Sequence, residues 1–344
     1  MGSGKTTSFD IAHRAGVSQA TVSRALRDSP LVNPQTRERV KKIARELNYQ
    51  VDRTAAGLRS QQSNTLAILL FEDPTSDDSQ INPFFLSMLG NITRAAARRN
   101  YDVLVSFQQL STDWHIKYQV SNRADGIILL GYGGYSGFAD KVDKLVKAEA
   151  HFVVWGATGP GLSGQTIGCD NASGAYDATS HLIKLGRKNI AFFGGNTENS
   201  PEFKQRYEGY CEALRSAGMK VDAALQFNAD SQESSGASAA SSLLKTGKPF
   251  DAIFAASDLI AIGAIKHIRR EGKRIPEDVS VIGFDNIPAA SYFTPSLTTV
   301  HQDTIAAGEQ LVNQLIGMIK GEKPESQLLQ PSLVIRRSCG GKPS

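Results

Sequence analysis

Cysteine, tryptophan and long apolar runs are scarce in this chain, which has three cysteines and two tryptophans among 344 residues. Cys169, Cys211 and Cys339 are odd in number and far apart, and they show neither the CxxC spacing of redox sites nor the paired spacing of zinc sites. A disulfide scaffold is therefore excluded. We expect inert thiols, in a protein that needs no metal and no cofactor.

The apolar runs, such as 66–71 and 126–130, are far shorter than the ~20 residues that a membrane-spanning helix needs. The N-terminus also lacks the basic stretch and the following apolar stretch of an export signal. We therefore expect a cytoplasmic protein with no membrane partner. Its hydrophobic content of 40% and its length suffice for at least two buried cores.

Signatures of enzymes are missing as well. No HExxH motif and no GxSxG elbow occurs, and the six histidines are scattered. The GxGxxG spacing at 159–164 does not open a helical stretch, so the full dinucleotide-binding fingerprint is missing too. The segment from Gly2 to Thr7 imitates the end of a phosphate-binding loop, but it lacks the preceding strand and the earlier glycine that such a loop needs. The sequence therefore predicts that the protein is not an enzyme.

Charge is unevenly distributed along the chain. Residues 1–60 hold 11 lysines and arginines against five acids, a net charge of +6, whereas the remainder holds 27 basic and 29 acidic residues, a net charge of −2. A basic head on a near-neutral body is typical of a protein whose head alone meets a polyanion. On charge alone, a solvated charged surface is an equally good interpretation.

The basic head has the pattern of three short helices. Ser8 can cap a first helix that Gly16 ends, and Ser18 can cap a second helix over 19–26 after a three-residue turn. Asn33 before Pro34 starts a third helix, whose apolar positions 40, 43, 44 and 47 follow the helical period. This arrangement predicts a helix-turn-helix whose second helix enters the major groove of DNA.

The start and exposed side of the second helix carry side chains suited to DNA. Gln19 can bond the edge of adenine, Ala20 and the methyl group of Thr21 can touch thymine methyl groups, and Arg24 can grip guanine or phosphate. Ser23 can bond phosphate. The alternative is a merely solvated helix face.

The run from Thr7 to Leu26 (TSFDIAHRAGVSQATVSRAL), with 32–40 and 47–49, resembles the opening of the LacI/GalR family of bacterial transcription regulators. The resemblance implies base readout by Gln19, Ala20 and Arg24. It implies contacts to the DNA backbone from Ser8, Ser18, Thr21, Ser23, Asn33, Thr36 and Tyr49. Residues 51–63 occupy the place of a family hinge helix that orders on DNA, with Ala55 as a contact and Leu58 as a minor-groove wedge. A flexible linker is the alternative for this segment.

From residue 65 onward, strand-like runs alternate with helical stretches, which favours βαβ units and parallel sheets. About 280 residues of this pattern exceed one ordinary sheet, so we expect two doubly wound subdomains in an α/β body. The expected strands are 66–71, 101–107, 126–131, 152–155, 189–193, 251–255 and 279–284. The expected helices include 84–99, 174–185 and 260–271.

The body resembles the same family through an NPFF motif at 82–85, Asp170-Asn171, RYEGY at 206–210 and PEDVSVIGFD at 276–285. The resemblance implies a periplasmic-binding-protein-like effector module whose two lobes are crossed three times by the chain. The expected division is a headpiece over 1–50, a hinge over 51–63 and an effector module over 64–339. Within the module we expect an N-subdomain of 64–164 and 297–328 and a C-subdomain of 165–296 and 329–339.

Ligands of such sheets bind beyond the carboxyl ends of the strands. There Arg206 offers a fork of donors, and Asp258 and Asp285 can each accept two hydroxyl hydrogen bonds, a set suited to the vicinal diols of a sugar. Phe84 and Trp155 could stack on a sugar ring. The candidate effector-binding residues are Phe84, Trp155, Arg206, Ser257, Asp258, Asp285 and Gln302. The alternatives are core aromatics for Phe84 and Trp155, helix caps for Asp170 and Asn171, and a turn residue for Asp285.

A helix-turn-helix head reads few base pairs, so specificity requires two heads on a two-fold site. We therefore expect a homodimer that binds double-stranded, pseudo-palindromic operator DNA. The expected function is a repressor that a mono- or disaccharide bound between the lobes switches allosterically. A repressor that needs a purine or another small molecule as corepressor, and a sugar-binding transport protein, are the rival interpretations.

Overall fold

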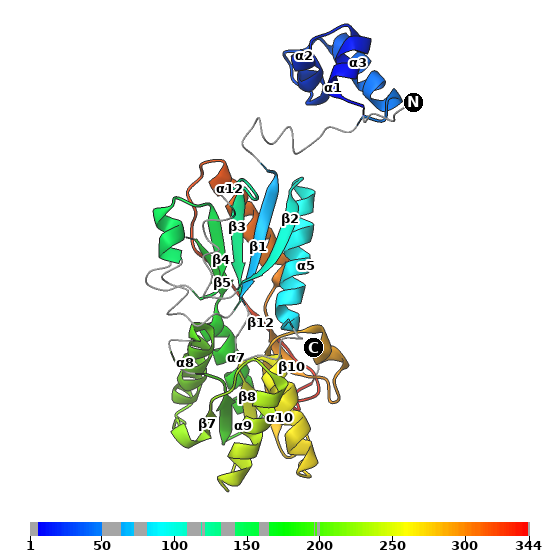
Figure 1. The fold of residues 1–344 in the computed structure, drawn as a ribbon. Helices are drawn as coiled ribbons and strands as arrows, with labels where there is room; N and C mark the ends of the chain where they lie inside the picture. Colours follow the sequence, from blue (N-terminus) through cyan, green and yellow to red (C-terminus); the bar gives the residue numbers. More distant parts are fainter. Residues whose placement is uncertain are drawn as a thin grey trace. The chain divides into compact units, whose positions relative to one another are not determined.

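The computed structural model of the chain describes residues 6–49, 63–71, 81–108, 118, 121–131, 142–157, 165–195, 197 and 200–342. It divides into two compact units, Met1–Ser63 and Asn64–Ser344 (Figure 1). We call the first unit the head and the second the body. The predicted hinge residues Ala55 and Leu58 lie outside the described residues.

The head contains three helices, α1 (Ser8–Ala15), α2 (Gln19–Leu26) and α3 (Pro34–Glu46). Gly16 ends α1 in the left-handed conformation with φ of 63°, as predicted. Ser18 caps α2 by accepting a hydrogen bond from the Thr21 amide at 3.2 Å, and Asn33 caps α3 by accepting one from the Gln35 amide at 2.9 Å.

The predicted cap of α1 was displaced by one residue. Thr7, not Ser8, is the N-cap, and Ser8 is the first helical residue. The Asp10 carboxylate accepts hydrogen bonds from both the backbone amide and the hydroxyl of Thr7, each at 2.7 Å. A threonine three residues before an acid completes a capping box, which a serine at position 8 cannot do with Ile11 at the matching position.

One small core holds the three helices together. Ile11 of α1, Val22 of α2 and Val40 of α3 are completely buried, and Ala25 and Ala44 pack beside them. These positions follow the helical spacing of the sequence pattern. The head therefore has an apolar interior of its own, separate from the body.

The body has two six-stranded sheets (Figure 1). The first sheet has the order β11-β5-β4-β3-β1-β2, and its strand pairs are parallel. Its strands are β1 (Thr65–Phe71), β2 (Asp102–Gln108), β3 (Gly126–Leu130), β4 (Phe152–Trp155), β5 (Thr166–Cys169) and β11 (Gln327–Leu329). Helices α5 (Pro83–Arg98) and α12 (Thr304–Ile319) pack against each other; α5 contacts β2, and α12 contacts β3, β4 and β5. We call this sheet with α5 and α12 the N-lobe.

The second sheet has the order β12-β10-β9-β8-β6-β7 and is parallel except for the antiparallel pair of β10 and β12. Its strands are β6 (Ile190–Phe193), β7 (Gln226–Phe227), β8 (Ala252–Ala255), β9 (Ser280–Asp285), β10 (Thr298–His301) and β12 (Ser332–Val334). Its helices are α7 (Asn171–Lys184), α8 (Pro201–Ser216), η1 (Ala223–Leu225), α9 (Glu233–Lys245), α10 (Asp258–Arg270) and α11 (Pro288–Tyr292). We call this sheet with its helices the C-lobe. Two doubly wound parallel-sheet lobes confirm the predicted fold class.

The chain passes between the lobes three times, after β5, after β10 and after β11. The first two passages lie beyond the predicted boundaries at 164 and 297, because β5 pairs with β4 in the N-lobe and β10 pairs with β9 in the C-lobe. A strand of only four residues can be assigned to a sheet only from the strands with which it pairs. The apolar pattern of the sequence does not contain that information.

Among the described residues, no helix combines the length and the apolar character needed to cross a membrane. The three cysteines are free and buried, and burial raises the pKa of the Cys169 thiol to about 12. A thiol that stays protonated at neutral pH is a poor nucleophile and a poor metal ligand.

Helices α7 and α8 cross at very short range, and this crossing positions the polar residues described below. A Cβ atom on Gly209 of α8 would lie 2.1 Å from the carbonyl oxygen of Ala172 and 3.0 Å from the Cβ atom of Ala175. Only glycine permits this approach. Gly209 lies three residues after Arg206, on the same side of the helix.

We predict that Gly209→Ala destabilises the body by about 1–3 kcal/mol, because the added methyl group overpacks the crossing of α7 and α8. Gly90→Ala is the matched control. A Cβ atom at this position in α5 meets no described atom within 4 Å, so alanine should stabilise the helix by up to about 1 kcal/mol. Urea unfolding measures both changes, and equal effects of the two substitutions would contradict the close crossing.

Candidate functional site

The second helix of the head presents its polar side outward. Val22 and Ala25 are buried, while Ala20 and Arg24 are exposed on the opposite side. Gln19 is half-buried, and its side-chain Nε2 donates a hydrogen bond to the Ser8 hydroxyl at 2.7 Å. The residues predicted to read bases therefore share one accessible side of α2.

Several polar groups predicted to contact DNA already have partners within the head. Ser18 Oγ and Thr21 Oγ1 are 2.9 Å apart, and Arg27 donates to Ser23 Oγ at 2.6 Å. Asn33 uses its side chain as a helix cap. Thr36 and Tyr49 are half-buried, with Tyr49 packed against the head core.

The positive charge of the head is partly neutralised by local ion pairs. Lys41 and Arg37 lie 2.5 and 3.7 Å from the Asp28 carboxylate, and the hydrogen bond from Lys41 lowers the pKa of Asp28. Within residues 6–49, Arg24 and Lys42 pair with no acid. These exposed cations remain available for phosphate oxygens.

The C-lobe contains a buried polar cluster around Arg206, whose side chain is 1% exposed. Its Nε donates to Asn171 Oδ1 at 2.8 Å, and one terminal nitrogen donates to the carbonyl oxygen of Ala256 and lies 3.5 Å from Asp285 Oδ1. The guanidinium also stacks 3.7 Å above the ring of Phe284. Arg206 thereby joins α7, α8 and the ends of β8 and β9.

Asp285 completes this cluster at the carboxyl end of β9. Gln302 Nε2 donates to Asp285 Oδ1 at 2.7 Å. Burial raises the pKa of Asp285 to about 6, even though Arg206 and Gln302 both favour the ionised form. The residue also has a φ of 113°, a region that L-residues rarely adopt. Asp285 is therefore a buried, constrained carboxylate and not an ordinary turn residue.

Ser257 and Asp258 have partners within the C-lobe. Ser257 caps α10 by accepting from the Ile260 amide at 3.3 Å. Asp258 is completely buried, and its two oxygens accept from the Ile287 amide at 2.8 Å and the Thr299 hydroxyl at 2.5 Å. Both predicted effector ligands thus hold together the elements that surround Asp285, and a direct contact with an effector stays a prediction.

Phe84 and Trp155 lie in the N-lobe and are nearly completely buried. Their ring centroids are 6.1 Å apart, at the start of α5 and at the carboxyl end of β4. Asn82, the cap of α5, donates to the Ser231 hydroxyl of the C-lobe at 3.0 Å. The two aromatic rings therefore border the junction of the lobes as part of the core.

Two participants were missed by the sequence analysis. Asn171, considered there only as a cap, is buried and accepts from Arg206, whereas Asp170 is the true cap of α7. Glu202 is buried at the start of α8 and accepts from the amide of Ala157 in the N-lobe at 2.9 Å, and burial raises its pKa. Its spacing of four residues before Arg206 places both charges on one side of a helix, a signal that the sequence does contain.

Two cluster residues lie at passages between the lobes, and a neighbour of the cluster is bonded to the third passage. Asn171 follows the passage after β5, and Gln302 lies in the passage after β10. At the passage after β11, Gln330 donates to Asp170 at 3.5 Å. A ligand that changes the hydrogen bonds of Arg206 or Asp285 would therefore act directly on residues where the lobes are joined.

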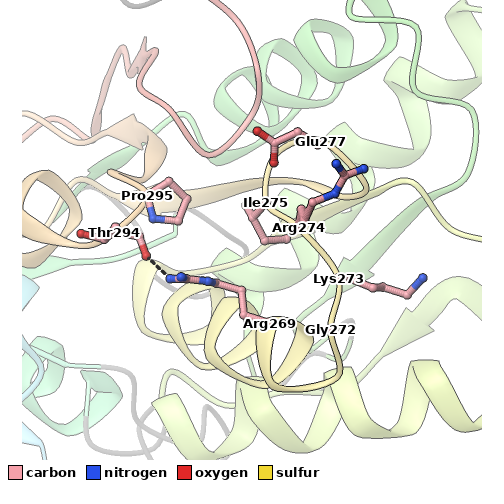
Figure 2. Close-up of a pocket in the computed structure, with 8 residues that line it drawn as sticks. All are labelled: Arg269, Gly272, Lys273, Arg274, Ile275, Glu277, Thr294 and Pro295. Atoms are coloured by element: carbon pink, nitrogen blue, oxygen red, sulfur yellow. Dashed lines mark hydrogen bonds between the residues drawn. The ribbon is translucent and has the colours of Figure 1, made fainter.

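Two hollows of the C-lobe lie away from this cluster. One, of about 400 Å³, is lined by Arg269, Lys273, Arg274, Thr294 and their neighbours, with Arg269 bonded to the Thr294 carbonyl (Figure 2). The other, of about 610 Å³, lies around Asn189 and Ile190. Both are at the amino ends of strands β6, β9 or β10, whereas ligands of doubly wound sheets bind at the carboxyl ends. Among the described residues, no group of three histidine, cysteine or acidic side chains is placed to hold a metal ion.

A helix-turn-helix head joined to a two-lobed body, with a polar cluster at the lobe junction, defines a DNA-binding transcription regulator that carries its own effector module. Comparison with known proteins agrees. Residues 9–52 match the family of bacterial regulatory proteins called lacI, and residues 179–339 match the periplasmic binding protein-like domain. The chain is 32% identical to the HTH-type transcriptional repressor CytR of Escherichia coli (strain K12), over 98% of this chain and 97% of the relative. It is 30% identical to the HTH-type transcriptional regulator CelR of Thermobifida fusca, over 95% and 96%.

Solved structures agree as well. A complex of the transcriptional regulator CelR with cellobiose is 30% identical, with a TM-score of 0.72 over 97% of this chain and 99% of that one. The lac repressor dimer bound to operator and the anti-inducer ONPF is 25% identical, with a TM-score of 0.80 over 97% and 99%. This chain therefore belongs to the LacI family of bacterial transcription regulators. It is a regulator and not an enzyme.

We predict that Asp285 makes stability depend on pH. Its pKa is about 6 in the folded protein, above the ordinary value of 3.8, so its stabilising contribution is complete below pH 4 and is lost as the pH rises through 6. The free energy of unfolding contributed by Asp285 should therefore fall between pH 4 and 7, and Asp285→Asn should remove this fall of about 3 kcal/mol. Urea unfolding at several pH values measures this slope.

Asp278→Asn is the matched control for this experiment. Asp278 is half-buried, and the hydrogen bond from Arg274 lowers its pKa, so the substitution should leave the slope between pH 5 and 7 unchanged. An unchanged slope in Asp285→Asn would contradict the assignment of the raised pKa to Asp285.

Proposed function

We propose that the chain is a homodimeric repressor in the cytoplasm. In this proposal, a small polyhydroxylated effector, a mono- or disaccharide, binds between the lobes and releases operator DNA. The observation that carries the proposal is the buried cluster of Arg206, Asn171, Asp285 and Gln302 at the carboxyl ends of the strands. Neutral hydroxyl groups can donate to Asp285 and accept from the guanidinium without burying a further charge. The name of CytR as a repressor and the cellobiose complex of CelR support this reading.

The proposed mechanism depends on the hydrogen bonds of the cluster at the segments where the chain passes between the lobes. An effector that bonds Arg206 or Asp285 competes with the bond that Arg206 donates to Asn171 or with the bond that Asp285 accepts from Gln302. It therefore favours one arrangement of the lobes over another. By linkage, the effector must change the affinity for DNA by the factor by which DNA changes the affinity for the effector.

Features of both the head and the body favour a homodimer. A two-fold operator needs two heads, and the lac repressor structure is a dimer bound to operator. Strand β2 is an edge of the N-lobe sheet, and its Val105 and Phe107 side chains are 42% and 46% exposed on one face. Such an apolar face on an edge strand suits contact with a second copy of the chain.

We predict that the full chain binds a selected palindromic duplex as two copies, and that the affinity falls steeply as salt is raised because phosphates are neutralised. Arg24→Ala should cost about 1–3 kcal/mol on the preferred sequence and relax the base preference. Fluorescence anisotropy over a salt series and sedimentation measure these quantities. Affinity that does not depend on salt, or retained binding after deletion of residues 1–60, would refute DNA binding by the head.

We predict that a matching sugar at ~100 times its dissociation constant raises the free energy of unfolding by about 2.7 kcal/mol and lowers DNA affinity by about 5- to 150-fold. Arg206→Lys keeps the charge but loses the planar fork, so it should weaken sugar binding at least ~10-fold in calorimetry. Retained affinity in both Arg206→Lys and Asp285→Asn would exclude this site. A purine that tightens DNA binding would instead identify a corepressor and exclude the sugar.

A further inference from the structure

The side chains of Ser8 and Gln19 meet across the first two helices of the head. Each is the first residue of its helix. Gln19 Nε2 donates to Ser8 Oγ at 2.7 Å, a short bond between neutral groups, and both side chains are half-buried. The long side chain that is predicted to enter the major groove is therefore bonded to a second residue of the head.

In this bond the Gln19 amide is the donor and the Ser8 hydroxyl is the acceptor, which leaves a defined edge of the amide for a base. A glutamine amide has two N–H donors and one carbonyl acceptor. With one N–H directed to Ser8, the remaining N–H and Oε1 form a donor–acceptor pair. That pair complements adenine, which offers an acceptor at N7 and a donor at N6 in the major groove. The inverted amide, with Oε1 accepting from the Ser8 hydroxyl, would instead present N–H donors, which suit the N7 and O6 acceptors of guanine.

We propose that Ser8 is a positioning residue that sets the base preference of Gln19 for adenine. The inference rests on the proposed DNA-binding function and adds a determinant of sequence preference. It gives Ser8 a role different from the phosphate contact that the family resemblance implies. A phosphate contact strengthens binding to every sequence about equally, whereas a positioning residue changes the discrimination between bases.

The surroundings of the pair favour this role. The neighbouring hydroxyls of Ser18 and Thr21 bond each other, so Ser8 is the hydroxyl that holds Gln19. Fixing the glutamine in the free protein removes rotamer freedom before DNA arrives, so less is lost on binding. Ser8→Ala removes the holding group without removing the reading group.

The test uses the full chain and a library of duplexes with randomised half-sites. The wild type should select adenine at one position of each half-site, and Gln19→Ala should abolish that preference. Ser8→Ala should lower the preference at the same position by about 3- to 10-fold, the factor that one net hydrogen bond contributes. Ser8→Thr, which keeps the hydroxyl, should restore it. Equal thermal midpoints show that the variants are folded.

A double-mutant cycle separates positioning from a direct contact. In the Gln19→Ala background, Ser8→Ala should no longer change base preference, because there is no amide left to orient. A uniform loss of affinity on all sequences, or selection of guanine by the wild type, overturns the inference while leaving DNA binding intact. Absence of any selected sequence for the wild type would instead refute the proposed function.

Discussion

The buried guanidinium of Arg206 is the group on which the arrangement of the C-lobe depends. A charge this deeply buried is stable only with hydrogen-bonding partners, because an unpaired buried charge costs several kcal/mol. The partners come from α7, from the residue after β8 and from the end of β9. The close crossing at Gly209 brings α8 near enough to α7 for the bond to Asn171. The sheet and both helices must therefore be assembled together for Arg206 to be tolerated.

The same group explains how a buried cluster can serve as a switch. Asp285 lies beside Arg206 and has a raised pKa and an uncommon φ. The rest of the fold therefore holds in place a buried carboxylate and a backbone conformation that are both unfavourable by themselves. Glu202, one helical turn before Arg206, reaches the N-lobe amide of Ala157. Electrostatic balance within the C-lobe and contact between the lobes are thus parts of one network. A polar ligand that alters the balance also alters the contact.

The sequence predicted most of the architecture because helix periods, caps and alternating strands are local signals. Ser18, Gly16 and Asn33 behave as their local sequence requires. The partners of polar side chains are not local. Nothing near Asp258 in the sequence indicates that Thr299 and the Ile287 amide use both of its oxygens. The lobe membership of β5 and β10 and the role of Asn171 likewise depend on residues distant in the chain.

The separation of cores limits how the effector can act. The buried apolar residues of the head form one cluster, and the described clusters of the body contain no head residue. The cap of α2 and the bond between Ser8 and Gln19 lie within the head itself. We therefore propose that an effector bound in the body does not act by repacking α2. The effector can instead change the relative placement of the two folded heads of a dimer. Binding of the second head to the operator depends on its effective concentration at the second half-site. In the proposed mechanism, sequence preference and regulation are separate properties, the first determined by the head and the second by the junction of the lobes.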